Sequence, residues 1–293
     1  MPYQAEISRS NPGVIGFLID QSGSMEYMMR GTSMKKSRIC ADYIDSFLDR
    51  LITRNLDGDI VKNRFEVFAL GYGQDENGNP VYSVLSGYQM GQPPISLEKL
   101  DSFRQIREVD KKYKEPEPDG AGGTIDGIKI MKEKIPFWIT ERHFGLTPME
   151  AAFRNAFHII SDWVSNHPNS YPPILINITD GVHNEGEDPE PIAADLRTLA
   201  TGDGNALVFN VYLASEDTQG QSVLFPDRDT YVPNDPFEQK LLNMSSNLVD
   251  KMIEYARAKR DKPMSKNAAG FACNANFSDF IDFLDIGTRP AAV

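Results

Sequence analysis

The chain has little cysteine and no long apolar run. Its two cysteines, Cys40 and Cys273, are too few for a disulfide framework or a zinc-binding set. We therefore expect both to be small, buried hydrophobic residues. No apolar stretch approaches the roughly 20 residues that a membrane-spanning helix needs. The first ten residues, MPYQAEISRS, have neither the basic region nor the apolar core of a signal peptide. These absences predict a soluble, cytoplasmic protein.

Positive charge is also scarce. The chain has 30 basic and 42 acidic residues, a net charge of −12. Binding to nucleic acid or to an anionic membrane relies mainly on Lys and Arg, so we expect neither as a partner. The 293 residues are enough to bury one sizeable core. We predict a single domain over residues 1–293, with an insertion at about 90–145 and a C-terminal helical extension at about 237–287.

Three short and almost continuous apolar runs predict buried strands at residues 14–19, 174–178 and 206–213. Runs of this kind are typical of a parallel sheet that is covered on both faces. Two more mixed runs begin at Arg64 and Val81, and the turn-forming stretch DENGNP separates them. This pair predicts a hairpin.

Helical periodicity fills the gaps between the strands. Broad apolar stripes at residues 37–53 and 149–164 predict two amphipathic helices. Further helices are expected at 191–200 and 237–259, and a short one behind Asn276 or Ser278 as the cap. The alternation of strand and helix predicts an α/β fold, Rossmann-like and doubly wound. We expect a mostly parallel central sheet flanked by helices, with one antiparallel edge strand.

The segment at 90–145 does not follow this alternation. It is rich in proline and glycine and has no sustained period, so it is either an ordered insertion at the rim or a partly mobile arm. Gly120, Gly122 and Gly123 are not followed by the Gly-Lys-Ser/Thr of a phosphate-binding loop, which favours a turn and linker.

Polar oxygen-bearing side chains follow two of the predicted strands. The stretch FLIDQSGSM places Asp20, Ser22 and Ser24 directly after the first strand, and Asp180 follows ILINIT. In a parallel sheet these strand ends lie at the same edge, and neighbouring strands are about 5 Å apart. Two carboxylates so close repel each other and raise a pKa, and a divalent cation removes that cost.

The chemistry of these groups indicates which cation they suit. Oxygen-only ligands favour Mg²⁺, with Ca²⁺ or Mn²⁺ as alternatives, over zinc. A further hydroxyl is available at Thr147, just before the predicted helix at 149–164. The candidate metal ligands are Asp20, Ser22, Ser24, Thr147 and Asp180.

Three segments, residues 20–24, 147–148 and 179–181, resemble the metal-ion-dependent adhesion site (MIDAS) of von Willebrand factor A (VWA) domains. The form of the first motif is closest to that of bacterial, intracellular members, and the resemblance covers about residues 13–214. It implies that Ser22, Ser24 and Thr147 contact the metal by their hydroxyls. Asp20 and Asp180 would act directly or through water, and one position would stay free for an acidic residue of a partner.

The resemblance also sets the expected function. It implies a protein-binding module that is not an enzyme, with no catalytic residues. The partner would offer a Glu or Asp to the metal, and an ATPase, kinase or phosphatase of a signalling, stress or defence system is a candidate. The segment before Thr147 is longer than in a minimal VWA domain, and could shield the site or extend the docking surface.

Two other interpretations remain open at this level. Asp20 and Asp180 could simply cap turns, with Ser22 and Ser24 bonded locally to the backbone. Asp20 could also be the nucleophile of a phosphatase of the haloacid dehalogenase type, although Ser22 stands where that class has a second Asp. The four histidines show no metal or triad spacing; they are His143, His158, His167 and His183.

Partner choice is expected to depend on three loops, at residues 26–33, 90–145 and 183–191. The first lies within a run rich in adaptable apolar groups: Met25, Tyr27, Met28 and Met29. These residues either form a recognition surface or pack under the insertion.

Overall fold

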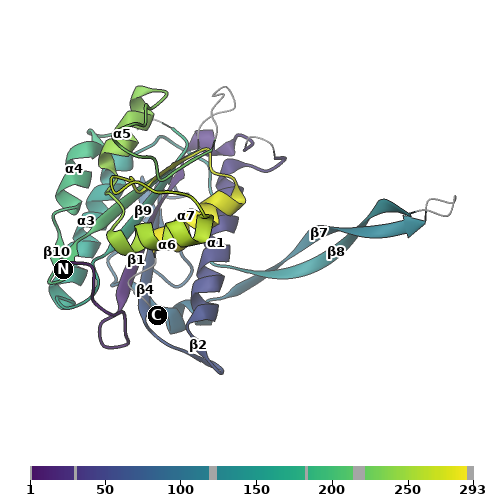
Figure 1. Ribbon diagram of the computed structural model, residues 1–293, viewed down its shortest axis with the longest axis horizontal. Coiled ribbons are helices and arrows are strands. Elements are labelled where there is room, and N and C mark those ends of the chain that lie inside the picture. The colour runs from purple at the N-terminus through teal and green to yellow at the C-terminus, as the bar shows by residue number, and fades with distance from the viewer. Residues whose placement is uncertain (1, 30–31, 119–123, 182–183, 214–221, 289–293) are drawn as a thin grey trace.

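The computed structural model describes residues 2–29, 32–118, 124–181, 184–213 and 222–288. Its centre is an eight-stranded sheet of order β13-β14-β12-β9-β1-β4-β5, with β6 also paired to β4 (Figure 1). The parallel strands are β1 (Gly13–Gln21), β4 (Phe65–Gly73), β9 (Ile174–Thr179), β12 (Leu207–Tyr212) and β14 (Phe271–Cys273). The predicted α/β fold with a mostly parallel central sheet is confirmed.

Antiparallel strands lie at both edges of this sheet, so the expectation of one such strand was wrong. They are β5 (Val81–Ser83) and β6 (Ile95–Ser96) beside β4, and β13 (Val223–Leu224) beside β14. The predicted hairpin is β4–β5, and Asp75 holds its turn by accepting from the N–H groups of Asn77 and Asn79. β13 has two residues, too short for any sequence period to reveal it.

The helices form two groups, α3–α4–α5 and α1–α6–α7 (Figure 1). The predicted stripes at 37–53 and 149–164 are α1 (Lys36–Arg54) and α3 (Met149–Asn166). Asn276 caps α7 (Phe277–Gly287) by accepting from the N–H of Asp279. The helix expected at 191–200 is α4 (Pro189–Leu196), which begins two residues earlier and ends four residues earlier.

The helix predicted at 237–259 is two helices, α5 (Pro236–Met244) and α6 (Asp250–Arg260). Between them, the N–H of Ser246 donates to Val208 O at 2.7 Å, and the N–H of Leu248 donates to Ala268 O at 2.8 Å. Backbone groups bonded to other segments cannot continue a helix, and sequence periodicity does not reveal such distant partners. The region at 237–287 also contains β14, which belongs to the central sheet.

Both cysteines are buried and free, as expected. Within the described parts of the chain, no helix is both long enough and apolar enough to cross a membrane.

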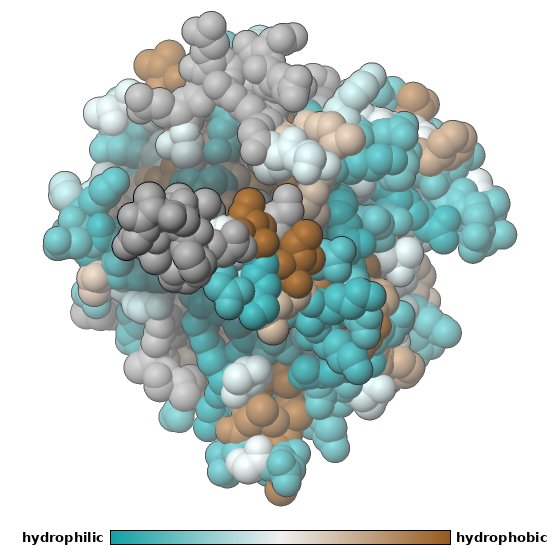
Figure 2. Space-filling view, turned by 90° about the vertical axis from the view of Figure 1, so that its right-hand side faces the viewer, coloured by the Kyte–Doolittle hydropathy of each residue, from teal (hydrophilic) through white to brown (hydrophobic). Residues whose placement is uncertain are grey.

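The insertion contains a long two-stranded arm. After the short helix α2 (Leu97–Ser102), β7 (Gln105–Pro118) pairs antiparallel with β8 (Thr124–Phe137) and projects from the body (Figure 1). On the side of the molecule from which the arm projects, hydrophobic residues lie in small groups among hydrophilic ones (Figure 2). The exposed apolar residues of the arm are Ile106, Tyr113, Ile128, Ile130 and Met131. Because both faces of the ribbon meet water, its sequence lacks the alternation that marks a half-buried strand.

Asp45, in the middle of α1, holds the base of this arm. Its Oδ1 accepts from the N–H groups of Trp138 and Ile139 at 2.8 and 2.9 Å, and Arg107 of β7 pairs with it. The Asp45 side chain is buried, and burial raises its pKa to about 7. A buried acceptor thus fixes the point where the arm rejoins the body.

We predict that Asp45→Ala lowers the free energy of unfolding by about 2–4 kcal/mol, because two buried N–H groups lose their acceptor. Asp45→Asn keeps an acceptor oxygen and should lose less than half as much. Urea denaturation of the two variants and the wild type measures both values. Equal losses in the two variants would show that these hydrogen bonds do not stabilise the fold.

Candidate metal centre

The predicted site residues meet at the carboxyl edge of the central sheet. In the parallel register, Ile19 of β1 lies opposite Ile178 of β9, so the next residues of both strands reach the same edge. Asp20 is the next residue of β1, and Asp180 directly follows β9. Both residues are buried, with 0% and 4% of their whole surface exposed.

Hydrogen bonds link four of the five predicted ligands. Asp20 accepts from the Ser22 N–H at 2.9 Å and from the Thr179 hydroxyl at 2.7 Å. The Ser24 hydroxyl donates to Asp180 at 2.6 Å, and the Ser22 and Ser24 oxygens lie 3.2 Å apart. A 3₁₀ turn at Gly23–Glu26 begins directly after Ser22 and contains Ser24, so it sets the position of that residue. Residues 156 positions apart in sequence are therefore in direct contact.

Thr147, the fifth predicted ligand, is buried in a loop that is bonded to the end of β1. The N–H of Phe144 donates to Gln21 O at 2.8 Å, and that of Gly23 donates to Gly145 O at 3.0 Å. Gly145 has φ +91°, and a Cβ there would lie 2.6 Å from Gln74 Cβ, so only glycine fits. The N–H of Thr147 donates to Asn184 Oδ1 at 2.7 Å. The structure thus brings Thr147 to the same edge and adds Asn184, which the sequence analysis missed.

Lys36 is a second residue that the sequence analysis missed. Its Nζ lies 2.7 Å from Asp180 Oδ2, and both side chains are almost fully buried, at 3% and 0% exposure. Lys36 is also the first residue of α1, where the helix dipole disfavours a cation. A lysine in that unfavourable position is the sequence signal that could have identified it.

The two carboxylates differ in how their charge is compensated. Lys36 pairs with Asp180, whereas the described residues that donate to Asp20 are neutral. Burial, and then the charge of Asp180, raise the pKa of Asp20 to about 6. Ionised Asp20 is therefore costly at neutral pH, and a divalent cation beside it would remove that cost.

The donor set fits a hard cation. Carboxylate and hydroxyl oxygens are the ligands that Mg²⁺ and Ca²⁺ prefer. Among the described residues no group of three or more His, Cys, Asp or Glu is placed to hold a metal ion, so this donor set combines two carboxylates with hydroxyl groups. His143 lies 3.2 Å from Lys35 Nζ, and His167 stacks on Trp163, so neither joins the cluster. His183 lies outside the described residues.

Comparisons with known proteins give structural likeness only. No protein-family model and no curated protein matches the chain. Proximal thread matrix protein 1 from the mussel byssus matches at TM-score 0.47 and 11% identity over 97% of this chain and 48% of its own. A second structure of it, described as having a zinc-occupied MIDAS motif, gives 0.45 and 12%, over 96% of this chain and 47% of its own.

The pilus adhesin SpaC from Lactobacillus rhamnosus GG matches at TM-score 0.49 and 12% identity, over 97% of this chain and 30% of its own. The chain therefore spans about half the length of the mussel protein and less of the adhesin. At such low TM-scores and identities, we base the function of the site on its own contacts.

We predict that Asp20 makes the metal-free protein less stable as pH rises. The folded state holds the Asp20 proton up to a pKa of about 6, whereas an unperturbed Asp has a pKa of 3.8. Between these values the folded state binds more protons, so the free energy of unfolding falls with rising pH, by at most about 3 kcal/mol.

The measurement is urea denaturation in EDTA at pH 4 and pH 7. Other groups also titrate in this interval, so Asp20→Asn is the control. The wild type should lose more stability than the variant between the two pH values. Equal losses in both proteins would contradict the account of Asp20.

Proposed function

We propose that the chain is a doubly wound VWA-type domain whose edge cluster is a MIDAS that binds a divalent cation, Mg²⁺ in the first place. Through this cation it binds a carboxylate of a protein partner. The observation that carries the proposal is the contact between the Asp20-to-Ser24 segment and Asp180, with Asp20 buried and without a cationic partner in the described part of the chain. The hydroxyls of Ser22, Ser24 and Thr147 and the two carboxylates would hold the ion.

Lys36 makes this site suited to a carboxylate. The two aspartates carry two negative charges, and Lys36 adds one positive charge. A divalent cation would bring the cluster to a net charge of +1, so an incoming Glu or Asp would neutralise it. Without Lys36 the same cluster would already be neutral, and an arriving carboxylate would leave it negative. Lys36 is thus expected to weaken metal binding and to strengthen partner binding.

The surface beside the site supports a more specific description of the partner. A hollow of about 620 Å³ adjoins the loops of the edge, and its lining includes one arginine and several acidic residues: Glu26, Asp75, Glu76 and Glu141. A partner segment with a carboxylate at the metal and basic residues in this hollow would complement the positive charge of the metal and the acidic lining of the hollow.

The apolar residues after the first motif fall into two classes. Met25 and Met29 are buried, at 0% and 8% exposure, and belong to the core. Tyr27 and Met28 are 70% and 48% exposed. An exposed aromatic beside an adaptable methionine is a common composition for a binding surface. We assign Tyr27 and Met28 to partner recognition.

The arm does not shield the metal centre in its described part. It leaves the body beside α1 and extends sideways from it (Figure 1). Of the two roles that the sequence left open, this direction supports an extension of the docking surface.

A hydrolase of the haloacid dehalogenase type is the less favoured alternative. Ser22 occupies the position of that class's second Asp, and a hydroxyl cannot replace a carboxylate as the general acid and base. We propose a binding module without catalysis. A bacterial signalling, stress or defence role and an ATPase, kinase or phosphatase partner remain predictions from the resemblance. A cytoplasmic location remains a prediction from the sequence.

We expect Mg²⁺ to bind the wild type and not Asp20→Ala, because the variant loses a buried anionic ligand. Isothermal titration calorimetry measures both affinities. Asp59→Ala, which changes an exposed aspartate in the turn between the short strands β2 (Leu56–Asp57) and β3 (Ile60–Val61), is the matched control. Equal Mg²⁺ affinity in the wild type and Asp20→Ala would exclude the proposed centre.

The second prediction concerns recognition. Tyr27→Ala combined with Met28→Ala should reduce Mg²⁺-dependent capture of the partner several-fold, because exposed contact area is lost. Metal affinity and melting temperature should stay unchanged. Capture on immobilised protein with Mg²⁺ and with EDTA identifies the partner and provides the assay. A marked fall in melting temperature would instead place these residues in the core and move recognition to the insertion.

A further inference from the structure

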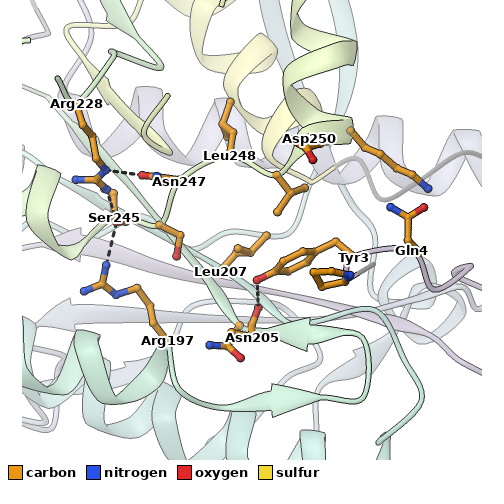
Figure 3. Close-up of a pocket in the computed structure, with 15 residues that line it drawn as sticks. Tyr3, Gln4, Arg197, Asn205, Leu207, Arg228, Ser245, Asn247, Leu248 and Asp250 are labelled. Carbon is orange, nitrogen blue, oxygen red and sulfur yellow. Dashed lines mark hydrogen bonds between the residues drawn. The ribbon is translucent and has the colours of Figure 1, made fainter. Parts of the chain in front are cut away.

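A second hollow lies at the opposite end of the central sheet from the metal centre. It has a volume of about 680 Å³ and lies between the N-terminal segment, the start of β12 and the turn that joins α5 to α6 (Figure 3). Leu207, which lines it, is the first residue of β12, whereas Asp20 and Asp180 lie at carboxyl ends of strands. Nothing in the proposed function uses this hollow.

Two arginines meet at one end of it. Arg228 and Arg197 approach Ser245 from opposite sides, and both donate to its carbonyl oxygen (Figure 3). Arg228 also donates to Leu242 O at 2.8 Å and to the side-chain oxygen of Asn247. These bonds satisfy carbonyl groups at the end of α5, which is a sufficient structural role for Arg228.

Arg197 contributes little to the fold that Arg228 does not already provide. A guanidinium has five N–H donors, and among the described residues the Arg197 side chain donates one hydrogen bond, to a carbonyl that Arg228 already satisfies. Its Nε is buried and has no hydrogen-bond partner among these residues. Arg197 therefore brings a second positive charge beside Arg228 and leaves most of its donors unused.

No carboxylate of the described residues forms an ion pair with either arginine, in a chain of net charge −12. Burial lowers the pKa of both groups, and the charge of Arg197 lowers that of Arg228 further. Glu190 acts on Arg197 electrostatically without forming an ion pair. Two neighbouring guanidinium groups without a counter-ion are the arrangement that proteins use to bind oxyanions.

The rest of the hollow could receive an organic group. Leu207 and Leu248 lie between the arginine end and Tyr3, whose ring forms part of the opposite end (Figure 3). The Tyr3 hydroxyl donates to Asn205 O at 3.1 Å, which holds the ring in place. Lys251 adds a further cation to the lining, and Asp250 is its acidic member.

We propose that this hollow binds a small molecule that carries an oxyanion, preferably a phosphate monoester, with the oxyanion on Arg197 and Arg228. The organic part of the ligand lies along Leu207 and Leu248 toward Tyr3. Arg197 is a binding residue, and Arg228 both binds and caps α5. This proposal is independent of the metal centre.

The test uses phenyl phosphate, benzoate and phenol as probes, measured by isothermal titration calorimetry at low salt. EDTA is present throughout, so that no metal-bound anion contributes. Phenyl phosphate should bind the wild type, and phenol, which lacks the oxyanion, should not. Tighter binding of benzoate would support the oxyanion site and assign it to carboxylates.

Arg197→Gln should weaken phenyl phosphate binding about tenfold or more, because charge-assisted hydrogen bonds are lost. Arg154→Gln, at an arginine 54% exposed on α3, is the matched control and should bind as the wild type does. The melting temperature of Arg197→Gln should stay within a few degrees, since Arg228 still holds Ser245.

Three results would overturn the proposal: no binding of phenyl phosphate or benzoate to the wild type, equal binding by Arg197→Gln, or unfolding of Arg197→Gln.

Discussion

The proposed metal centre depends on two carboxylates that are buried at the carboxyl ends of neighbouring strands. Burying an anion is expensive unless a cation accompanies it. Lys36 pairs with Asp180, and within the described ranges the donors to Asp20 are neutral. The two carboxylates and one lysine of the cluster therefore carry a net negative charge. The free oxygens of the cluster suit a hard divalent ion. This imbalance, more than the presence of any single ligand, explains why a metal would bind here.

Helix α1 ties this edge to the rest of the molecule. Its first residue, Lys36, pairs with Asp180, and Asp45 in its middle holds the base of the arm. Near its end, Arg50 and Arg54 pair with Asp285 of α7. Three distant parts of the sequence are thus fixed to one rigid element. A partner that contacts both the metal and the arm would meet them in a defined relative position.

What the sequence could predict was local. Strands β1, β9 and β12 and helices α1 and α3 follow from short-range periodicity, and the five proposed ligands follow from ordered motifs. The place of Lys36 at a helix start marks it as unusual in the sequence, but its pairing could not be predicted, because its partner Asp180 is 144 positions away and meets it only after folding. The arm lacked a pattern because water covers both of its faces. The break between α5 and α6 depends on backbone bonds to Val208 and Ala268.

A buried polar chain crosses the sheet between its two ends. Tyr72, opposite Asp20 in the register, donates to Asn177, which donates to Asn210, which donates to the Ser245 hydroxyl. Burial, and then the charge of Asp20, raise the pKa of Tyr72, so it stays a donor at neutral pH. Each polar side chain of this network has a hydrogen-bond partner. A buried polar network that is satisfied in this way fixes one arrangement of the strands that carry it. The carbonyl oxygen of Ser245 also accepts hydrogen bonds from Arg197 and Arg228. The same network therefore sets the position of the proposed metal centre and of the second hollow. This continuous network gives the two ends of the sheet a common rigid frame.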